Sequence, residues 1–396
     1  MNKIKKMIFL LIALLLTLFL PLIGSLCRWN AFPPGFGDFP YQKVIEVPNF
    51  NIFYFIFACL IAVFITIFLL FPRLFGFKKY SKEQITKKEK VKFPIWFWIG
   101  GIILSISWFF MWGAGGIKLL KILSPYAFVP LWWGFIFLLD GIVYKRNSGV
   151  SIISAHFTIM KFMILISFFS WFLFEYFNYL VVGNWFYPNN EVFTNFGNIV
   201  WFSLSYATII PAIFEWFTLL HTFDSFRLRY SCGPTIHFTF KAKIIFLILG
   251  ILLSFGMGFF PFALFWGLWT CLIPILAAVM SIVGSWTAFV PLKKGDWTPI
   301  ILIALASLFN GFFWELWNYG SEFFNPGGNP NFWKYSVPYL DKIHIFSEMP
   351  ILGYFGYLFF GIGCWDFWLV SAYLLGFSPD IDFLNNITKI EKYKPK

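Results

Sequence analysis

The chain has 396 residues, of which 59% are hydrophobic and only 12% are charged. This composition excludes an ordinary soluble domain and predicts a polytopic membrane protein. The formal net charge of +12 does not indicate nucleic-acid binding, because Lys and Arg gather in every second loop, as the positive-inside rule predicts. No nucleotide-binding motif and no His or Cys spacing typical of a metal site occurs, so we expect no cofactor, no metal and no nucleic-acid partner.

Ten apolar segments can each cross a bilayer as a helix, which takes about 20 residues. We expect the spans at 7–26, 51–71, 94–112, 125–143, 162–182, 198–220, 244–259, 262–283, 299–319 and 350–374. The sequence Phe259-Phe260-Pro261 divides the apolar run that contains the seventh and eighth spans. The first segment is interpreted as an uncleaved span rather than a signal peptide, because a small-residue cleavage site is lacking.

The distribution of cationic residues predicts the orientation. With both termini in the cytoplasm, 24 of the 30 Lys and Arg residues lie inside. The six outside are Arg28, Lys43, Lys118, Lys121, Lys334 and Lys342. The longest basic stretch, 73–92, is then a cytoplasmic loop near anionic headgroups. We therefore predict an integral protein of a bacterial inner membrane with cytoplasmic N and C termini.

A motif of one carboxyl, one amide and two aromatic residues occurs twice, each time near the end of a span and in the loop that follows. The first copy consists of Glu175, Asn178, Trp185 and Tyr187, and the second of Glu315, Asn318, Trp333 and Tyr335. The carboxyl and amide positions are 140 residues apart, and the aromatic positions are 148 residues apart. This near-constant offset indicates an internal repeat.

The repeat predicts the fold class and the domain organisation. We expect an all-α membrane bundle of about ten helices, built from two parallel four-helix repeats and two additional N-terminal helices. The predicted units are 1–92, 93–243 and 244–396, and the halves 95–222 and 244–375 should superpose. Parallel repeats are related by an axis along the membrane normal, with the binding site between them.

The motif residues are suited to acid/base chemistry. A spacing of three residues places each carboxyl and its amide on one helix face, so the amide can hydrogen-bond the carboxyl. Apolar surroundings disfavour the anion, so Glu315 can remain a neutral acid that donates a proton. Gly311, on the same face, would let another group approach closely. Glu348, at the start of the last span, is expected near Glu315, so that one carboxyl serves as acid and the other as base.

The candidate site residues fall into two groups. The catalytic candidates are Glu315, Asn318, Glu175, Asn178 and Glu348, and the substrate-binding candidates are Trp185, Tyr187, Trp333, Tyr335 and Glu215. Each has a structural alternative, because polar pairs also join helices and aromatic residues also form interfacial belts. Asp140 is interpreted as the partner of Lys145 and Arg146 in an ion pair at the cytoplasmic end of its helix.

Two resemblances extend this interpretation. The segments PLWWGFIFLLDGIVYKRNSG, WFLFEYFNYLVVGNWFY and FFWELWNY, with the later FWKYSVP and EMPILGYFGY, resemble a family of uncharacterised bacterial polytopic membrane proteins over residues 95–375. More loosely, the chain resembles lycopene-cyclase-domain proteins, which also repeat an acid, a Trp near an outer loop and a later Pro with acidic residues. That resemblance implies protonation of an isoprenoid olefin by a carboxylic acid, although the adjacent Pro-x-Glu-Glu is missing here.

Three functional hypotheses remain open at this stage. The first is an acid/base enzyme with an outer-leaflet site between the repeats, acting on a membrane lipid or isoprenoid. The alternative is a transporter or lipid-binding protein that uses the same carboxyls for proton or cation coupling. The third is a scaffold in which polar pairs only join helices. The sequence does not predict an oligomeric state.

Overall fold

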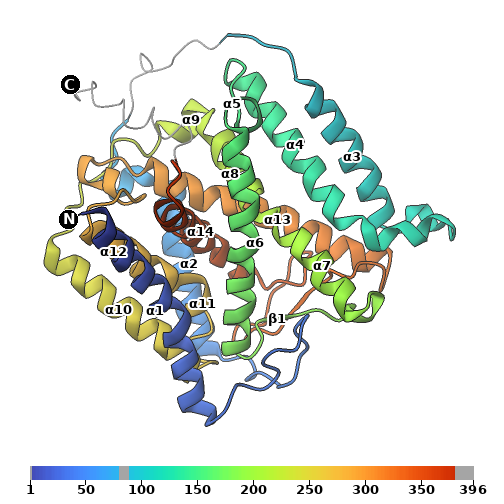
Figure 1. The fold of residues 1–396 in the computed structure, drawn as a ribbon, viewed down its shortest axis with the longest axis horizontal. Helices are drawn as coiled ribbons and strands as arrows, with labels where there is room; N and C mark the ends of the chain where they lie inside the picture. Colours follow the sequence, from blue (N-terminus) through green and yellow to red (C-terminus); the bar gives the residue numbers. More distant parts are fainter. Residues whose placement is uncertain (1, 80–88, 380–396) are drawn as a thin grey trace.

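A computed structural model of the protein describes residues 2–79 and 89–379. Its architecture is all-α, with a single two-stranded sheet in the described residues, as Figure 1 shows. The main helices are α1 (Lys3–Trp29), α2 (Ile52–Leu70), α3 (Ile95–Met111), α4 (Phe128–Arg146), α6 (Phe157–Leu180), α7 (Asn195–Tyr206), α8 (Ile209–His221), α10 (Phe240–Phe259), α12 (Leu272–Ile282), α13 (Thr298–Phe324) and α14 (Tyr354–Leu375). Short helices are α5 (Ile152–Ala155), α9 (Asp224–Arg227) and α11 (Gly267–Thr270), and the strands are β1 (Trp185–Phe186) and β2 (Lys334–Tyr335).

The helices agree closely with the predicted spans. Within the described residues, eight helices are long and apolar enough to cross a membrane, with α7 and α8 counted as one. Two shorter apolar helices, Ile95–Met111 and Gly267–Ile282, stand at the third and eighth predicted spans. The all-α class and the polytopic membrane character follow from these helices. The count of ten, the repeats and the side on which the termini lie stay predictions, and parts of the basic loop 73–92 and of the C-terminal tail lie outside the described residues.

Small residues hold two helix pairs in close contact. A Cβ added to Gly258 on α10 would meet the carbonyl oxygen of Pro21 on α1 at 2.0 Å, and one on Gly24 would meet that of Phe255 at 2.1 Å. In the same way, a Cβ on Gly134 of α4 would meet the Leu104 nitrogen of α3 at 2.6 Å. Such close backbone approach is typical of helix packing in membranes.

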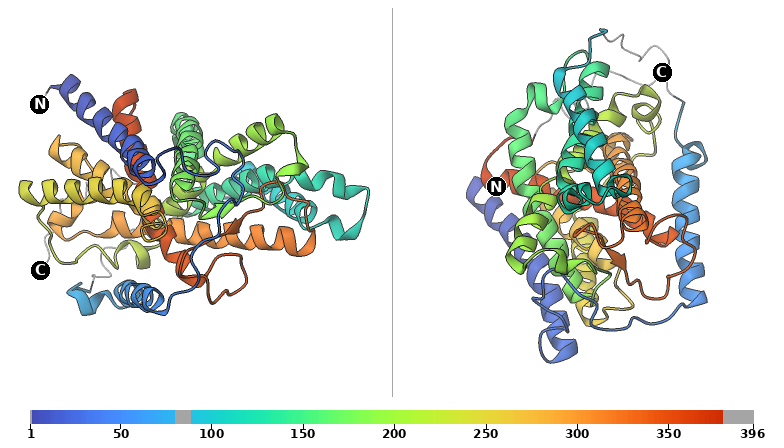
Figure 2. Two further views of the ribbon diagram at one scale, coloured as in Figure 1. Left: turned by 90° about the horizontal axis from the view of Figure 1, so that it is seen from below. Right: turned by 90° about the vertical axis from the view of Figure 1, so that its right-hand side faces the viewer.

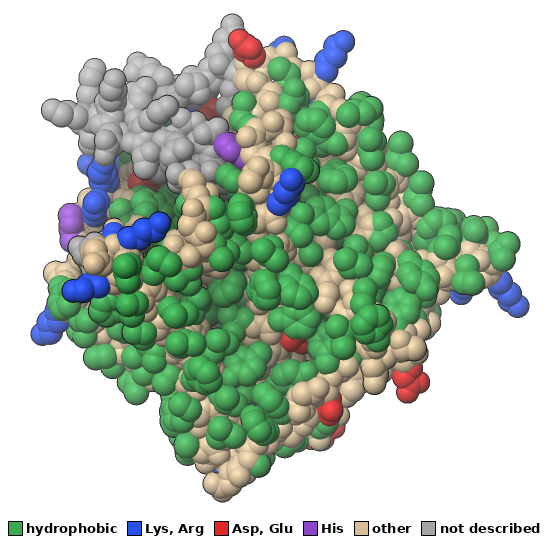
Figure 3. Space-filling model, viewed as in Figure 1, with side chains coloured by type: hydrophobic (Ala, Val, Ile, Leu, Met, Phe, Trp, Pro, Cys, Tyr) green, Lys and Arg blue, Asp and Glu red, His purple; other side chains and the backbone are tan. Residues whose placement is uncertain are grey.

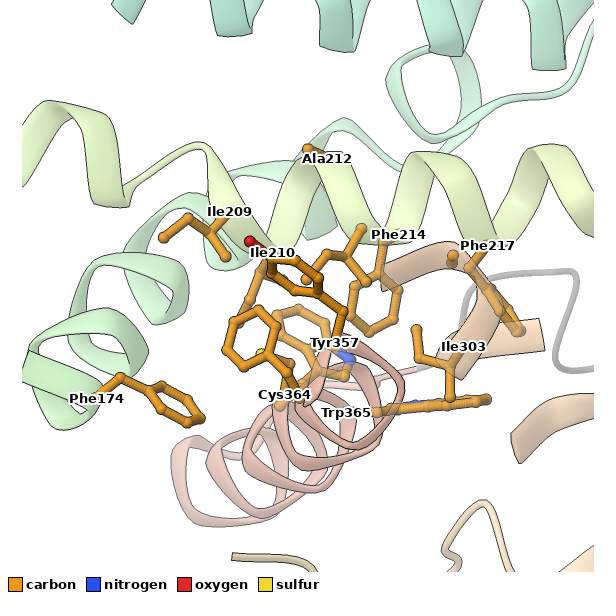
Figure 4. Packing of buried hydrophobic residues seen from close by; sticks show 14 of the residues in the cluster. Phe174, Ile209, Ile210, Ala212, Phe214, Phe217, Ile303, Tyr357, Cys364 and Trp365 are labelled. Carbon is orange, nitrogen blue, oxygen red and sulfur yellow. The ribbon is translucent and has the colours of Figure 1, made fainter. Parts of the chain in front are cut away.

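Aromatic and aliphatic side chains fill the centre of the bundle between α6, α8, α13 and α14. Figure 4 shows Phe214 and Phe217 of α8 directed toward Trp365 of α14, with Ile303 of α13 beside them. The Phe217 and Trp365 rings are 5.0 Å apart between centroids. The outer surface is also largely apolar, as the face in Figure 3 shows, with few charged side chains among the hydrophobic ones. Apolar side chains both inside and outside are what a bundle surrounded by lipid requires.

Helix α2 stands apart from the rest of the bundle, as both views of Figure 2 show. Only 6% of the most apolar stretch of this helix is buried inside the protein. Hydrogen bonds fasten it near both ends. Asn51 N–H donates to the Tyr339 carbonyl oxygen (3.1 Å) at one end, and the Tyr230 hydroxyl donates to the Leu69 carbonyl oxygen (2.8 Å) at the other. The middle of α2 is therefore joined to the bundle mainly by apolar contact.

Candidate functional site

The two motif copies meet in the two-stranded sheet. Trp185 pairs with Tyr335, and Phe186 pairs with Lys334, in antiparallel register. A further hydrogen bond joins the copies, from Ser336 N–H to the Asn184 carbonyl oxygen at 2.8 Å. The sheet thus brings together two loops that are about 150 residues apart in the sequence.

The two amides hold the strands at the ends of their helices. On α6, the Asn178 amide nitrogen donates to the Trp185 carbonyl oxygen (2.9 Å), and its oxygen accepts from Asn184 N–H (2.7 Å). On α13, the Asn318 amide nitrogen donates to the Trp333 carbonyl oxygen (2.9 Å), and its oxygen accepts from Trp333 N–H (3.0 Å). The expected amide-to-carboxyl hydrogen bond is therefore wrong. Unpaired backbone groups in the tight loop use the amides instead.

Glu315 is fully buried on α13 and accepts two phenolic hydrogen bonds. The Tyr335 and Tyr357 hydroxyls donate to its Oε1 at 2.7 and 2.8 Å. The Trp333 indole N–H donates in turn to the Tyr335 hydroxyl at 2.9 Å. The expectation for Gly311 is confirmed, because a Cβ there would meet the Tyr357 ring at 2.4 Å. Only glycine lets α14 bring this phenol to the carboxyl.

Glu175, on α6, is buried and has a similar arrangement with more donors. The Tyr187 hydroxyl donates to its Oε1 at 2.5 Å and the Tyr206 hydroxyl at 3.1 Å. Two indole N–H groups, from Trp171 and Trp185, donate to the same oxygen at 2.8 and 3.2 Å. In both carboxyls the other oxygen, Oε2, is buried and has no hydrogen-bond partner in the described part of the chain.

A cavity of about 60 Å³ lies between the two copies. Its lining consists of Phe128, Trp171, Trp185, Tyr187, Phe202, Ser205, Tyr206, Thr208, Ile209, Trp269, Trp314, Asn331, Trp333, Tyr335 and Tyr357. All four phenols that bind the carboxyls are in this wall, whereas the carboxyls themselves lie behind them. One buried water needs about 15 Å³ on this measure, so the cavity could hold roughly four waters. The cavity therefore fits one small group rather than a whole lipid.

The loop tyrosines remain protonated donors. Burial, and after it the charge of Glu315, raise the pKa of Tyr335 well above that of a free phenol. Burial and the charge of Glu175 do the same to the pKa of Tyr187. Each hydroxyl therefore keeps its proton at neutral pH, and its hydrogen bond to the carboxyl is a donated one.

Glu348 lies in the loop before α14 rather than in the helix. It is half-buried, and within the described residues no hydrogen bond joins it to Glu315. Burial raises its pKa, and the charges of Lys334 and His344 act in the opposite direction. The last span begins later than expected because Ile351–Gly353 forms a separate 3-10 turn. The structure thus places Glu348 beside the second copy of the motif, but not among the residues that line the cavity between the two copies.

Glu215 is not part of this cavity. It is fully buried on α8 beside the Asp140 carboxyl of α4, and neither of its carboxyl oxygens makes a well-formed hydrogen bond in the residues described. Asp140 of α4 does not form the expected ion pair. It accepts from the Trp96 indole (2.8 Å), the Ser151 hydroxyl (2.8 Å) and Ile153 N–H (2.9 Å). The ion pair fails because these uncharged donors already satisfy the buried carboxyl.

Three side chains that bind the carboxyls were absent from the predicted site: Trp171, Tyr206 and Tyr357. Trp171 precedes Glu175 by four residues, so helical spacing alone places it on the same face. No such signal exists for Tyr206 and Tyr357, because α7 and α14 bring them in from other parts of the chain.

Residues 2–79 and 89–379 contain no group of three or more His, Cys, Asp or Glu side chains that could hold a metal ion. The polar groups of the site are carboxyls, amides, phenols and indoles. Comparison of the chain with models of protein families, with curated proteins and with solved structures finds no match.

Proposed function

We propose that the protein is a membrane enzyme whose two buried carboxyls perform acid/base chemistry on one end of a lipid or isoprenoid. The proposal combines the matched carboxyls with an aromatic cavity small enough to select a single reacting group. The carboxyls would exchange protons with a group in the cavity through the phenols that line it.

One observation carries this proposal: all the hydrogen bonds to each carboxyl converge on one oxygen. Glu315 Oε1 accepts two hydroxyls and Glu175 Oε1 accepts four donors, while Oε2 of each lacks a partner among the described residues. An ionised carboxylate offers two equivalent acceptors, whereas a protonated one offers an acceptor oxygen and a hydroxyl. In Glu315, with two donors, the division suits a neutral acid that holds a transferable proton on Oε2. In Glu175, the four donors on one oxygen suit a carboxylate that is ionised when it acts as the base.

The phenols would carry protons between carboxyl and substrate. On the acid side, the Tyr335 or Tyr357 hydroxyl gives its proton to the substrate. The Glu315 carboxyl then turns its Oε2 hydroxyl toward the phenolate oxygen and replaces that proton. On the base side, a proton leaves the substrate for the Tyr187 or Tyr206 oxygen as that hydroxyl passes its own proton to an ionised Glu175. The result is a proton added at one point and removed at another. The faces of Trp185, Trp269 and Trp314 would stabilise the positive charge that develops between these steps.

The test compares Glu315→Gln and Glu175→Gln with the wild type in the native host. Gln preserves the shape of the side chain and accepts the phenolic hydrogen bonds, but it cannot release a proton. We expect the melting temperature of the purified variant to stay close to the wild type. The lipid product should be lost, since removing a general acid or base typically costs about 10²–10⁴ in rate. The measurement is mass spectrometry of whole-cell lipid extracts.

Glu46→Gln is the matched control, because Glu46 is an exposed loop carboxyl whose only described ion pair is with Lys43. It should leave the lipid profile unchanged. If Glu315→Gln cells also keep a wild-type lipid profile, the acid/base role is wrong. A scaffold would show the reverse order of damage, with Gln tolerated and Glu315→Ala destabilising. A carrier would leave total composition unchanged while altering how a lipid is distributed across the membrane.

A further inference from the structure

An apolar groove of about 630 Å³ runs between α2 and the bundle, next to the small cavity. Trp269 and Tyr335 line both spaces. The groove volume lies within the usual range for a bound small molecule, which is roughly 300–1,000 Å³. A molecule that passes one small group between the Trp269 and Tyr335 side chains into the cavity would have room in the groove for a long apolar remainder.

The two ends of the groove differ in polarity. Asn184, Tyr54 and Tyr335 stand at the end nearest the sheet. At the other end the walls are Ile65 of α2 and Leu249 of α10. From Tyr54 to Ile65 the helix rises about 16 Å, at roughly 1.5 Å per residue. The groove thus has the form that a single hydrocarbon chain with a polar head requires.

The side of the groove is open to lipid along α2. Phe57 and Ile61 line it, yet they are 63% and 44% exposed. The Tyr54 hydroxyl donates to the Ala263 carbonyl oxygen (2.9 Å), and Asn51 N–H to the Tyr339 carbonyl oxygen (3.1 Å), which closes the end nearest the sheet. Since these hydrogen bonds close the end nearest the sheet, we expect a hydrocarbon chain to enter from the side, between the exposed apolar side chains of α2.

We infer that this groove, defined by α2, α10 and the loop before α14, holds the hydrocarbon chain of the substrate, with the polar head at Asn184 and Tyr335. The inference rests on the proposed function, and it identifies the substrate class as a lipid with one long chain in the groove. The chain can be acyl or polyprenyl, since both present the same apolar surface, and the experiment separates the two.

The test uses purified full-length protein in lipid nanodiscs with two photoactivatable probes. One is a phosphatidylglycerol with a diazirine at the far end of one acyl chain, and the other is a polyprenol with a diazirine at the far end. We expect one probe to label residues near Ile65 and Leu249, saturably and in competition with its unlabelled analogue. The same head group with the diazirine next to it should label near Tyr335 instead. Cross-linked residues are mapped by mass spectrometry.

Two variants fill the groove from opposite walls. Ala58→Trp acts from α2, and Gly356→Leu acts from α14, where an added Cβ meets nothing closer than Trp269 at 3.7 Å. Each should lower saturable labelling at least tenfold. Val63→Trp, on the same helix but outside the groove lining, is the control and should label like the wild type. If one groove variant fails to fold, the other still gives the result.

The outcomes separate this inference from the proposed function. Glu315→Gln should bind the same probe as the wild type does, because chain binding does not need proton transfer. Labelling that does not saturate, or that persists in both groove variants, shows only surrounding lipid and overturns the inference. Saturable groove labelling together with an unchanged lipid profile in Glu315→Gln cells would retain the groove and overturn the acid/base function.

Discussion

Phe186 and Lys334 pair with each other in the sheet, and each stands between the Trp and the Tyr of its own motif copy. A residue that pairs with its own counterpart is what an isologous, two-fold contact produces, since residue i then meets j and j meets i. The neighbouring pair, Trp185 with Tyr335, fits the same relation. The sheet is therefore where the axis of the predicted repeat would cross these two loops.

This pairing predicts a disulfide in the double variant Phe186→Cys, Lys334→Cys. Paired residues of an antiparallel ladder have Cα atoms about 4.5–5.5 Å apart, which lies within the range that a disulfide spans. We expect nearly complete cross-linking under mild oxidation, detected as a linked peptide by mass spectrometry. Phe186→Cys combined with Lys342→Cys, which is in the same loop but outside the strand, should stay unlinked. Equal linking in both pairs would contradict the register.

Asn318→Ala should loosen the loop that carries the second aromatic pair. The substitution removes both hydrogen bonds to the Trp333 backbone, and leaving buried groups unpaired costs about 1–3 kcal/mol each. We expect faster hydrogen exchange in peptides covering 331–336 and a lower free energy of unfolding. Asn310→Ala is the control on the same helix, because neither amide atom of Asn310 has a hydrogen-bond partner among the described residues. Similar exchange in the two variants would refute the role of Asn318.

Gly311→Ala should separate Tyr357 from Glu315. The added methyl would meet the Tyr357 ring at 2.4 Å, so α13 and α14 must move apart. Overpacking of this kind costs about 1–3 kcal/mol, and we expect a corresponding loss in stability in mixed micelles. Gly101→Ala is the matched control, since its Cβ meets only Leu138 at 4.0 Å. That change should be neutral or stabilising by up to about 1 kcal/mol, because alanine favours a helix.

Removing single phenolic hydroxyls should show how much each tyrosine at Glu315 contributes to the free energy of unfolding. Tyr357→Phe loses one hydrogen bond, at a net cost of about 0.5–1.5 kcal/mol. Tyr335→Phe loses two, because its hydroxyl also accepts from the Trp333 indole, so its cost should be larger. Tyr126→Phe, at an exposed position, should change the free energy of unfolding by less than about 0.5 kcal/mol. A thermal unfolding series gives the order, and a larger effect for Tyr357 would refute it.

The sequence predicted the elements of this fold well because membrane spans are long and apolar. The break at Phe259-Phe260-Pro261 agrees with the end of α10 at Phe259. Helical spacing also correctly placed Glu315 and Gly311 on one face. Where the signal is local and periodic, a single sequence is sufficient.

The contacts of the site were harder to predict because they depend on tertiary structure. Asn318 was expected to bind Glu315. Its actual partner is the backbone of Trp333, 15 residues further along the chain. Asp140 was assigned to its cationic neighbours, although Ser151 and Trp96 satisfy it. In each case the expected partner nearby in the sequence is replaced by an uncharged group that the fold brings closer.

Helix α2 is attached to the rest of the protein by hydrogen bonds near its two ends, and its middle is largely exposed. Its tilt is therefore set by the distance between its two attachments on the bundle, whereas a helix without such attachments responds to a change in hydrocarbon thickness by tilting. The groove beside α2 should then keep its width when the thickness of the surrounding membrane changes. The protein, rather than the bilayer, would decide which chains the groove accepts.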